Sequence, residues 1–131
     1  MTDSLSDEEL AFLQSMFGLA RAGDTPQLVT SLDAGVPVNL TNGTGDTLLI
    51  LAAYHQHTET VRVLLSRGAD VERVNDRGQT ALAAAVFRQE GEIVSDLLSA
   101  GADPAAGGRS ALDVARFFDL PEMVALLEAR R

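Results

Sequence analysis

Apolar residues along this chain fall into pairs of short stretches, and each pair is followed by a polar, glycine-containing segment. The first stretch of a pair is a continuous apolar run, as at residues 48–53 and 81–86. The second has apolar residues at helical intervals, as in Val61, Leu64 and Leu65. Such spacing places the apolar side chains on one face of a helix. The pattern therefore predicts a unit of two short helices and a turn, followed by an extended loop.

This unit recurs at a fixed interval. Gly35, Gly68 and Gly101 are evenly spaced along the chain, and the residues around them align by eye. The same interval separates Thr47 from Thr80. Glycine is the usual left-handed residue after the end of a helix, so we expect these glycines to close the second helices. Because two short helices cannot bury their apolar faces alone, successive units are expected to stack around a continuous core.

Each unit also carries signals for the start of its helices. Thr47, Thr80 and Ser110 precede the first helices, where a hydroxyl can accept a hydrogen bond from an otherwise unpaired N–H group. Ser110 follows Thr80 sooner than Thr80 follows Thr47, so the last loop is shorter. Pro26 and Pro121 stand near the starts of second helices, where a missing N–H group costs little.

The beginning of the chain differs from the repeated unit. Ser6 and Glu9 have the spacing of a capping box, and Leu5 and Leu10 have that of a hydrophobic staple. We expect a longer helix from about residue 7 to residue 22, covering the open face of the first repeat. At the other end, Arg130 and Arg131 follow the last helix, where positive charge suits the helix dipole.

These residues resemble the ankyrin repeat family, whose repeat is about 33 residues long and whose signature is T-P-L-H-x-A. Residues 46–53 read DTLLILAA, residues 61–71 read VRVLLSRGADV and residues 76–80 read DRGQT. The resemblance covers roughly residues 10–129. The motif's proline, its histidine and the glycine of its turn are replaced, respectively, by Leu48, Ala81 and Ala111; by Ile50, Ala83 and Asp113; and by Gln56 and Gln89.

The resemblance implies one all-α domain spanning residues 1–131, an ankyrin-type solenoid of about four helix-turn-helix repeats with capping ends. In this family, proteins are generally bound along a concave groove by the first helices and the loop tips, and catalysis is rare. The approximate repeats are residues 7–41, 42–74, 75–106 and 107–131.

Alignment with the family places particular residues at the groove. We expect an aromatic ladder of Tyr54, Phe87 and one of Phe117 or Phe118, because aromatic and arginine side chains dominate interface hot spots. The alternative is that the rings pack between helices, and one of the last two phenylalanines is expected to plug the core. The residues predicted to bind the partner are Tyr54, His55, Phe87 and Arg88 on helices, and Asp46, Arg77 and Gln79 on loops.

Charge refines this picture. The net charge is −9, and all ten basic residues are arginine. An acidic chain repels phosphate backbones and anionic lipids, so nucleic acid and membrane are not expected partners. Several arginines align near the groove, which suggests a locally basic strip for an acidic, partly apolar partner. Alternatively, arginine is simply the only cation this chain uses. The arginines in question are Arg21, Arg67, Arg77, Arg88 and Arg109.

Catalytic and metal-binding patterns are missing from the sequence. Cysteine is absent, and His55 and His57, two positions apart, do not share a helix face. His57 aligns with a structural histidine of the family's turn, so no metal or other cofactor is expected. Neither histidine has an evident serine–aspartate partner, and we expect no enzymatic activity.

The resulting prediction is a non-catalytic adaptor or regulator that binds another, intracellular protein through its groove. A polar, acidic N-terminus and the lack of a long apolar stretch indicate the cytoplasm. The chain is expected to be a monomer. The alternative is a self-associating structural protein without a separate ligand, in which the exposed aromatic residues meet a second copy.

Overall fold

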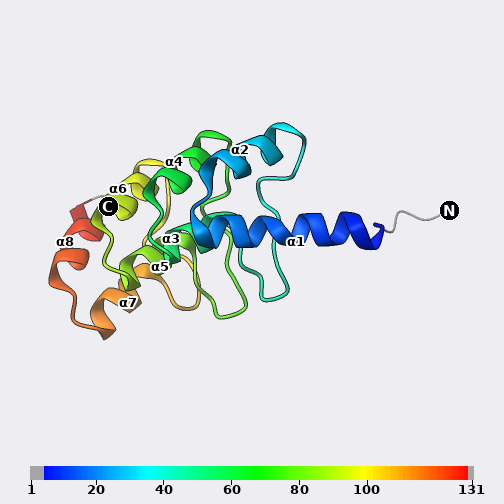
Figure 1. The fold of residues 1–131 in the computed structure, drawn as a ribbon. Helices are drawn as coiled ribbons and strands as arrows, with labels where there is room; N and C mark the ends of the chain where they lie inside the picture. Colours follow the sequence, from blue (N-terminus) through cyan, green and yellow to red (C-terminus); the bar gives the residue numbers. More distant parts are fainter. Residues whose placement is uncertain (1–4, 130–131) are drawn as a thin grey trace.

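In the computed structural model, residues 5–129 are described, and they form helices joined by turns and loops (Figure 1). The predicted role of Arg130 and Arg131 lies outside the described residues. The helices are α1 (Asp7–Ala22), α2 (Thr25–Asp33), α3 (Leu48–Tyr54), α4 (Thr58–Ser66), α5 (Ala81–Phe87), α6 (Gly91–Ser99), α7 (Ala111–Phe117) and α8 (Pro121–Ala129).

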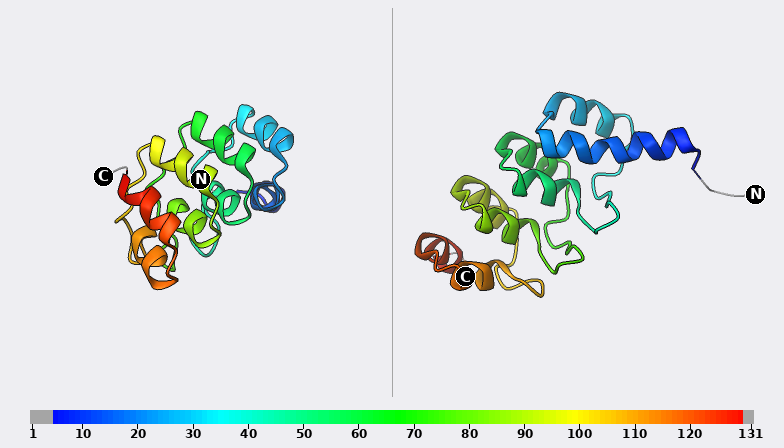
Figure 2. Two further views of the ribbon diagram at one scale, coloured as in Figure 1. Left: turned by 90° about the vertical axis from the view of Figure 1, so that its left-hand side faces the viewer. Right: turned by 60° about the horizontal axis from the view of Figure 1, so that its bottom comes forward.

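The helices stack in two layers. The first helices of the pairs, α1, α3, α5 and α7, pack in sequence order, and α2, α4, α6 and α8 pack in the same order beside them (Figure 2). Within residues 5–129 the only strand-like pairing is an isolated bridge between Thr41 and Thr47. The predicted all-α repeat solenoid is therefore confirmed. None of the helices in this range has both the length and the apolar character needed to cross a bilayer.

Side-chain caps begin the first helices as the sequence predicts. The hydroxyls of Thr47, Thr80 and Ser110 accept hydrogen bonds from backbone N–H groups at the third position of their helices. Ser6 and Glu9 form the expected reciprocal capping box at the start of α1, over 2.9 and 3.0 Å. These caps fix where α1, α3, α5 and α7 begin, and so fix which residues reach the other end of each helix.

The turns within the pairs contain left-handed residues. Gln56, Gln89 and Asp119 have φ angles of 67°, 58° and 54°, in a region that favours glycine. At the corresponding turn between α1 and α2 stands Gly23, with φ 72°. His57 packs against this glycine, and its Nε2 lies 2.6 Å from the carbonyl oxygen of Arg21. His57 thus ties the second repeat to the first, as its predicted structural role requires.

The core runs through all the repeats and is rich in alanine. Ala52, Ala53 and residues 83–85 are buried, so the first helices approach closely. The second helices contribute larger side chains such as Leu64 and Leu97, which are also buried. The first helices are consequently held as a rigid row. Leu5 and Leu10, the predicted staple, border one shallow hollow beside α1, but both remain exposed.

Candidate functional site

Aromatic rings from the ends of three first helices meet in a continuous line. The rings of Tyr54 and Phe87 are stacked, with centroids 6.2 Å apart and an interplanar angle of 8°. The Phe87 ring meets Phe118 edge to face at 5.5 Å, and Phe118 meets Phe117 in the same way at 4.9 Å. We call these four residues the aromatic strip. The predicted ladder is therefore formed, and it includes both of the last two phenylalanines.

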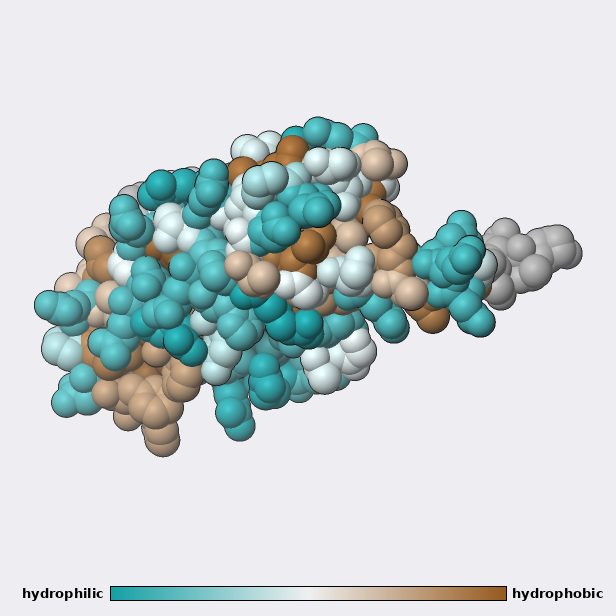
Figure 3. Space-filling model, in the orientation of Figure 1, coloured by the Kyte–Doolittle hydropathy of each residue, from teal (hydrophilic) through white to brown (hydrophobic). Residues whose placement is uncertain are grey.

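The aromatic strip lies at the surface and not in the core. Phe117 is 81% exposed, Phe118 50% and Phe87 41%, while Tyr54 is partly buried. The expectation that Phe117 or Phe118 plugs the core is wrong. Phe117 is the last residue of α7, and Phe118 comes directly after the helix. The core at this point is filled by earlier residues of α7, such as Val114 and Ala115. An apolar patch is visible at the lower left of Figure 3.

Arg88 and His55 flank the strip at Tyr54. The Arg88 guanidinium carbon lies 5.1 Å from the centre of the Tyr54 ring, within cation–π range. Arg88 Nη2 also donates to Gln56 Oε1 over 3.1 Å, which holds the guanidinium in place. The His55 ring meets the edge of Tyr54 at 5.2 Å. The structure thus brings together Tyr54, Phe87 and the residues that cap their helices, His55 and Arg88.

The pKa of His55 is lowered from its ordinary value of 6.5. Burial of the ring is the main cause, because desolvation disfavours the imidazolium form. Positive charge on His57, Arg21 and Arg88 acts in the same direction. The lowered pKa favours the neutral form of His55 at neutral pH, beside two permanent cations.

The loops between repeats supply the other wall of the site. The backbone N–H groups of Arg77 and Gln79 donate to the Asn75 side-chain oxygen over 2.9 and 3.0 Å. The Arg109 N–H group donates to the carbonyl oxygen of Gly78 over 3.0 Å, joining this loop to the next. Arg77 and Arg109 are thus carried on a backbone that neighbouring loops hold in place.

Asp46, predicted to bind the partner from a loop tip, is only 6% exposed. Its carboxylate accepts hydrogen bonds from the Asn75 amide and the Thr44 hydroxyl, each over 2.9 Å. Asp46 therefore joins one loop to the next, and the small exposed part of this residue borders a hollow that Tyr54 also lines. Asn75, the other residue that joins the two loops, is not among the site residues predicted from the sequence. It could have been found from the repeat, because it holds the position in its loop that Asn42 holds in the loop before.

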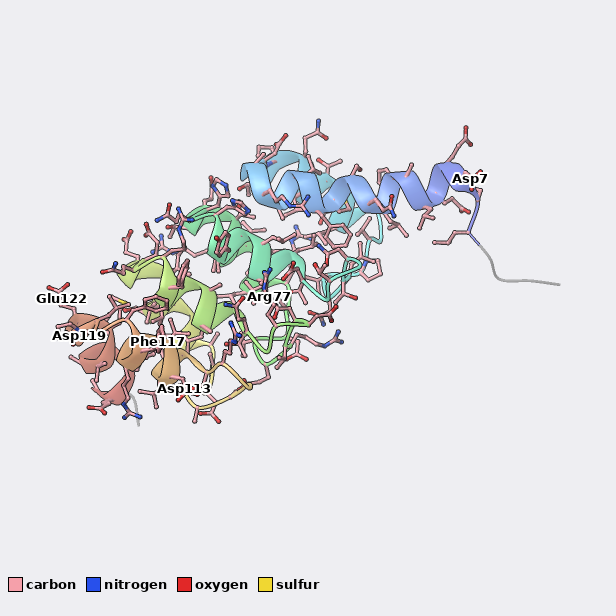
Figure 4. The ribbon with its side chains drawn as sticks, turned by 90° about the horizontal axis from the view of Figure 1, so that it is seen from below. Asp7, Arg77, Asp113, Phe117, Asp119 and Glu122 are labelled. Atoms are coloured by element: carbon pink, nitrogen blue, oxygen red, sulfur yellow. The ribbon has the colours of Figure 1, made fainter. Side chains whose placement is uncertain are left out.

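The aromatic strip and the loops line an open hollow of about 570 Å³, which we call the main hollow. Arg77, Asp113 and Phe117 come from a loop and from α7 and lie around it (Figure 4). A smaller hollow of about 160 Å³ adjoins it, and Tyr54, Arg77 and Gln79 border both. Residues lining the main hollow are Tyr54, Arg77, Gln79, Phe87, Gly108, Arg109, Asp113, Val114, Phe117 and Phe118.

Comparison with known families identifies the architecture. The family described as ankyrin repeats in three copies matches residues 16–107, more than half of the chain. The chain belongs to the ankyrin repeat family. Ankyrin repeats generally mediate protein–protein interactions and are generally non-enzymatic.

A protein of Pseudomonas aeruginosa that is named for its ankyrin repeats is 46% identical over 67 residues. The alignment takes in 48% of this chain and 39% of that protein, so the chain matches about two fifths of its relative's length.

The two other arginines predicted to lie near the groove of this ankyrin repeat domain differ in where the structure places them. Arg21 borders the smaller hollow, beside His55. Arg67 forms an ion pair with Asp33, joining the ends of α4 and α2, and lines none of the hollows described. Within residues 5–129, no group of three or more histidine and carboxylate side chains converges as metal ligands would.

Proposed function

We propose that this ankyrin repeat domain is a non-catalytic adaptor or regulator that binds another protein through the aromatic strip and the main hollow. The observation that carries the proposal is the line of four rings at the surface, three of which are at least 41% exposed. The cytoplasmic setting and the monomeric state expected from the sequence are part of the proposal.

The free energy of burying apolar surface supports binding of a partner over the aromatic strip. Aromatic side chains have large apolar areas, and leaving them in water forgoes the free energy that burial would supply. Exposed contiguous apolar patches on soluble proteins commonly mark interaction sites. Phe117 makes its ring contact with Phe118, which is itself half exposed. A partner that covers this pair gains apolar burial that the isolated domain lacks.

Rigidity supports the same proposal. Stacking on Phe87 and the guanidinium of Arg88 hold the Tyr54 ring, and the Asn75 network holds the loop opposite. Because these groups are ordered before binding, little conformational entropy is lost when a partner docks. A preorganised strip of this kind suits recognition of a folded surface or of an extended segment.

The lining of the main hollow favours binding over catalysis. It contains one carboxylate, Asp113, and no histidine. General acid–base chemistry relies on a positioned group whose pKa is matched to its task. Asp113 is exposed to solvent, and the other charged groups of this lining are the guanidiniums of Arg77 and Arg109. Such a set suits the binding of a charged ligand better than the transfer of a proton.

Site-specific photocrosslinking in living cells tests the proposal. A photoreactive phenylalanine analogue replaces Phe117 in one variant and Phe12 in a matched control. Phe12 is 50% exposed on α1 and lines none of the hollows described. The proposal expects one protein crosslinked from position 117 and not from position 12. Equal crosslinking from both positions, or none from position 117, would contradict it.

Self-association is the alternative, and the exposed Phe117 is the observation that favours it. In that case the crosslink from position 117 joins two copies of the chain. Sedimentation over a range of concentrations separates the two accounts. A monomer at all concentrations supports a separate partner, whereas a dimer that Phe117→Ser dissociates supports self-association.

A further inference from the structure

The arginines within residues 5–129 divide into two groups by their surroundings. Those in the first group form ion pairs with carboxylates on the body of the solenoid. Arg62 lies 2.7 Å from Asp96, for example, and Arg116 lies 3.1 Å from Glu128. The pairs formed in this range are Arg62 with Asp96 and Glu92, Arg67 with Asp33, Arg73 with Asp70 and Arg116 with Glu128.

The second group has no ion pair within the same range, and its members lie along the groove that the aromatic strip, the main hollow and the smaller hollow form together. Arg77 and Arg109 line the main hollow, and Arg21 shares the smaller hollow with Arg77. Arg88 lies over the Tyr54 ring and bonds to an uncharged amide. Cations without carboxylate partners within residues 5–129 are therefore gathered along this groove.

This division is unexpected in a chain with 19 acidic and ten basic residues. Carboxylates are abundant enough to pair with every arginine, yet the arginines near the groove form no ion pair within residues 5–129. Asp46, the buried carboxylate of the loops, is engaged by Asn75 and Thr44. Asp113 lines the main hollow with Arg77 and Arg109, but it forms no ion pair with either. The guanidinium groups of Arg77 and Arg109 are left open to a ligand.

We infer that the groove takes an acidic segment of a partner protein, with carboxylates at Arg77 and Arg109 and an apolar side chain on the aromatic strip. This inference rests on the proposed function and names the chemistry of its partner. Arginine binds carboxylates with paired, charge-assisted hydrogen bonds, and the Phe87 and Phe118 rings offer apolar contact beside them. Electrostatic complementarity then selects acidic partners over basic ones.

The net charge of the whole chain favours an acidic protein segment over nucleic acid as the ligand of the groove. A net charge of −9 repels the dense phosphates of nucleic acid at long range. Short acidic stretches of a protein carry fewer charges and bring apolar side chains that match the strip. A protein segment therefore fits both features of the groove, whereas a phosphate backbone fits the arginines alone.

Selection from a library of short random peptides displayed on phage tests the inference with the folded domain as bait. Recovered peptides are synthesised, and their affinities are measured by fluorescence anisotropy. Wild type is compared with the double variant Arg77→Gln/Arg109→Gln and with Arg62→Gln/Arg67→Gln. Both variants lose two positive charges, but the control variant loses them from ion pairs that lie away from the main hollow. Circular dichroism checks that each is folded.

The inference expects peptides rich in Asp and Glu beside Leu or Phe. The groove variant weakens their binding about tenfold or more, as loss of a charged contact does, and the control variant leaves it within about twofold. Replacing the peptides' acidic residues by amides has the same effect as the groove variant. Raising the salt from about 50 mM to about 500 mM also weakens binding.

Other outcomes separate the inference from the proposed function. Peptides without acidic enrichment that lose binding on Phe87→Ser, but not on Arg77→Gln/Arg109→Gln, overturn the inference and leave the groove as a binding site. If no recovered peptide depends on either set of residues, both are overturned. A uridine-rich RNA oligonucleotide that binds more tightly than the acidic peptides, through the same arginines, also overturns the inference.

Discussion

The Asn75 side-chain amide donates a hydrogen bond to the Asp46 carboxylate over 2.9 Å, and so joins two consecutive loops of the solenoid. Both residues are 6% exposed. The side-chain oxygen of Asn75 accepts from the backbone N–H groups of Arg77 and Gln79. This one pair therefore supports the loop on which a wall of the proposed binding site is built.

Removing this pair is expected to destabilise the domain. Asn75→Ala leaves buried acceptors and donors without partners, at a cost of about 1–3 kcal/mol in free energy of unfolding. Chemical denaturation measures this loss, and Asp76→Ala on the exposed neighbour should change stability by less than about 0.5 kcal/mol. In a double-mutant cycle, Asp46→Ala and Asn75→Ala should be non-additive. Additive effects of the two changes would mean that the bond contributes no coupling.

The left-handed turn at Gln89 offers a stabilising substitution. Its φ angle of 58° is strained for a residue with a Cβ atom. Gln89→Gly relieves this strain, and after the entropy cost of glycine the expected gain is up to about 1 kcal/mol. Gln89→Ala keeps the Cβ atom and should give no gain. Thermal denaturation compares the three proteins, and an equal effect of both substitutions would refute the explanation by strain.

Gly23 is expected to tolerate no side chain. A Cβ atom there would lie 2.5 Å from His57 Nδ1, and the φ angle of 72° adds strain. The His57 ring cannot move away without losing its contact with the Arg21 carbonyl. Gly23→Ala should therefore cost more than about 1 kcal/mol.

Gly18 provides the matched control for this substitution. It lies within α1, and an added Cβ atom there meets nothing within 4 Å. Gly18→Ala should stabilise the domain by about 0.5–1 kcal/mol, because alanine favours the helix. Denaturation curves of the two variants should thus shift in opposite directions, and shifts of the same sign would contradict the account of the turn.

Local signals in the sequence were sufficient for most of the fold. The caps at Thr47, Thr80 and Ser110 and the bounds of α1 depend on residues a few positions apart, so they can be predicted without a structure. Alignment within the repeat also placed Tyr54 and Phe87 together, because equivalent positions in stacked units become neighbours.

Burial set by contacts between repeats could not be predicted in the same way. The burial of Asp46 is one example, since nothing near it in sequence indicates that Asn75 of the next loop covers it. Phe117 or Phe118 was expected to supply a core plug, but Val114 and Leu127 already fill that end of the core. Both features depend on long-range packing, which apolar periodicity does not specify.

The titration of His55 predicts a dependence of stability on pH. Folding lowers the pKa of its ring from 6.5, mainly through burial, so the unfolded chain binds the proton more readily. The associated stability is full above about pH 6.5 and is lost as the pH falls toward the lowered value. Between about pH 8 and about pH 5.5, the free energy of unfolding should therefore fall less for His55→Gln than for wild type, as chemical denaturation at the two pH values would measure. A midpoint above about 6.5 for the His55 ring in an NMR titration would contradict this.

The central claim is that the aromatic strip is the surface that binds a partner protein, and titration calorimetry with the partner crosslinked at position 117 tests it most directly. Phe87→Ser and, as a second groove variant, Phe117→Ser are compared with Phe12→Ser, which removes an equally large exposed ring from α1. The account predicts about 30-fold weaker binding for the groove variants, the effect of losing a hot spot of about 2 kcal/mol, and a change within about twofold for Phe12→Ser. Unchanged affinity in both folded groove variants would contradict the claim.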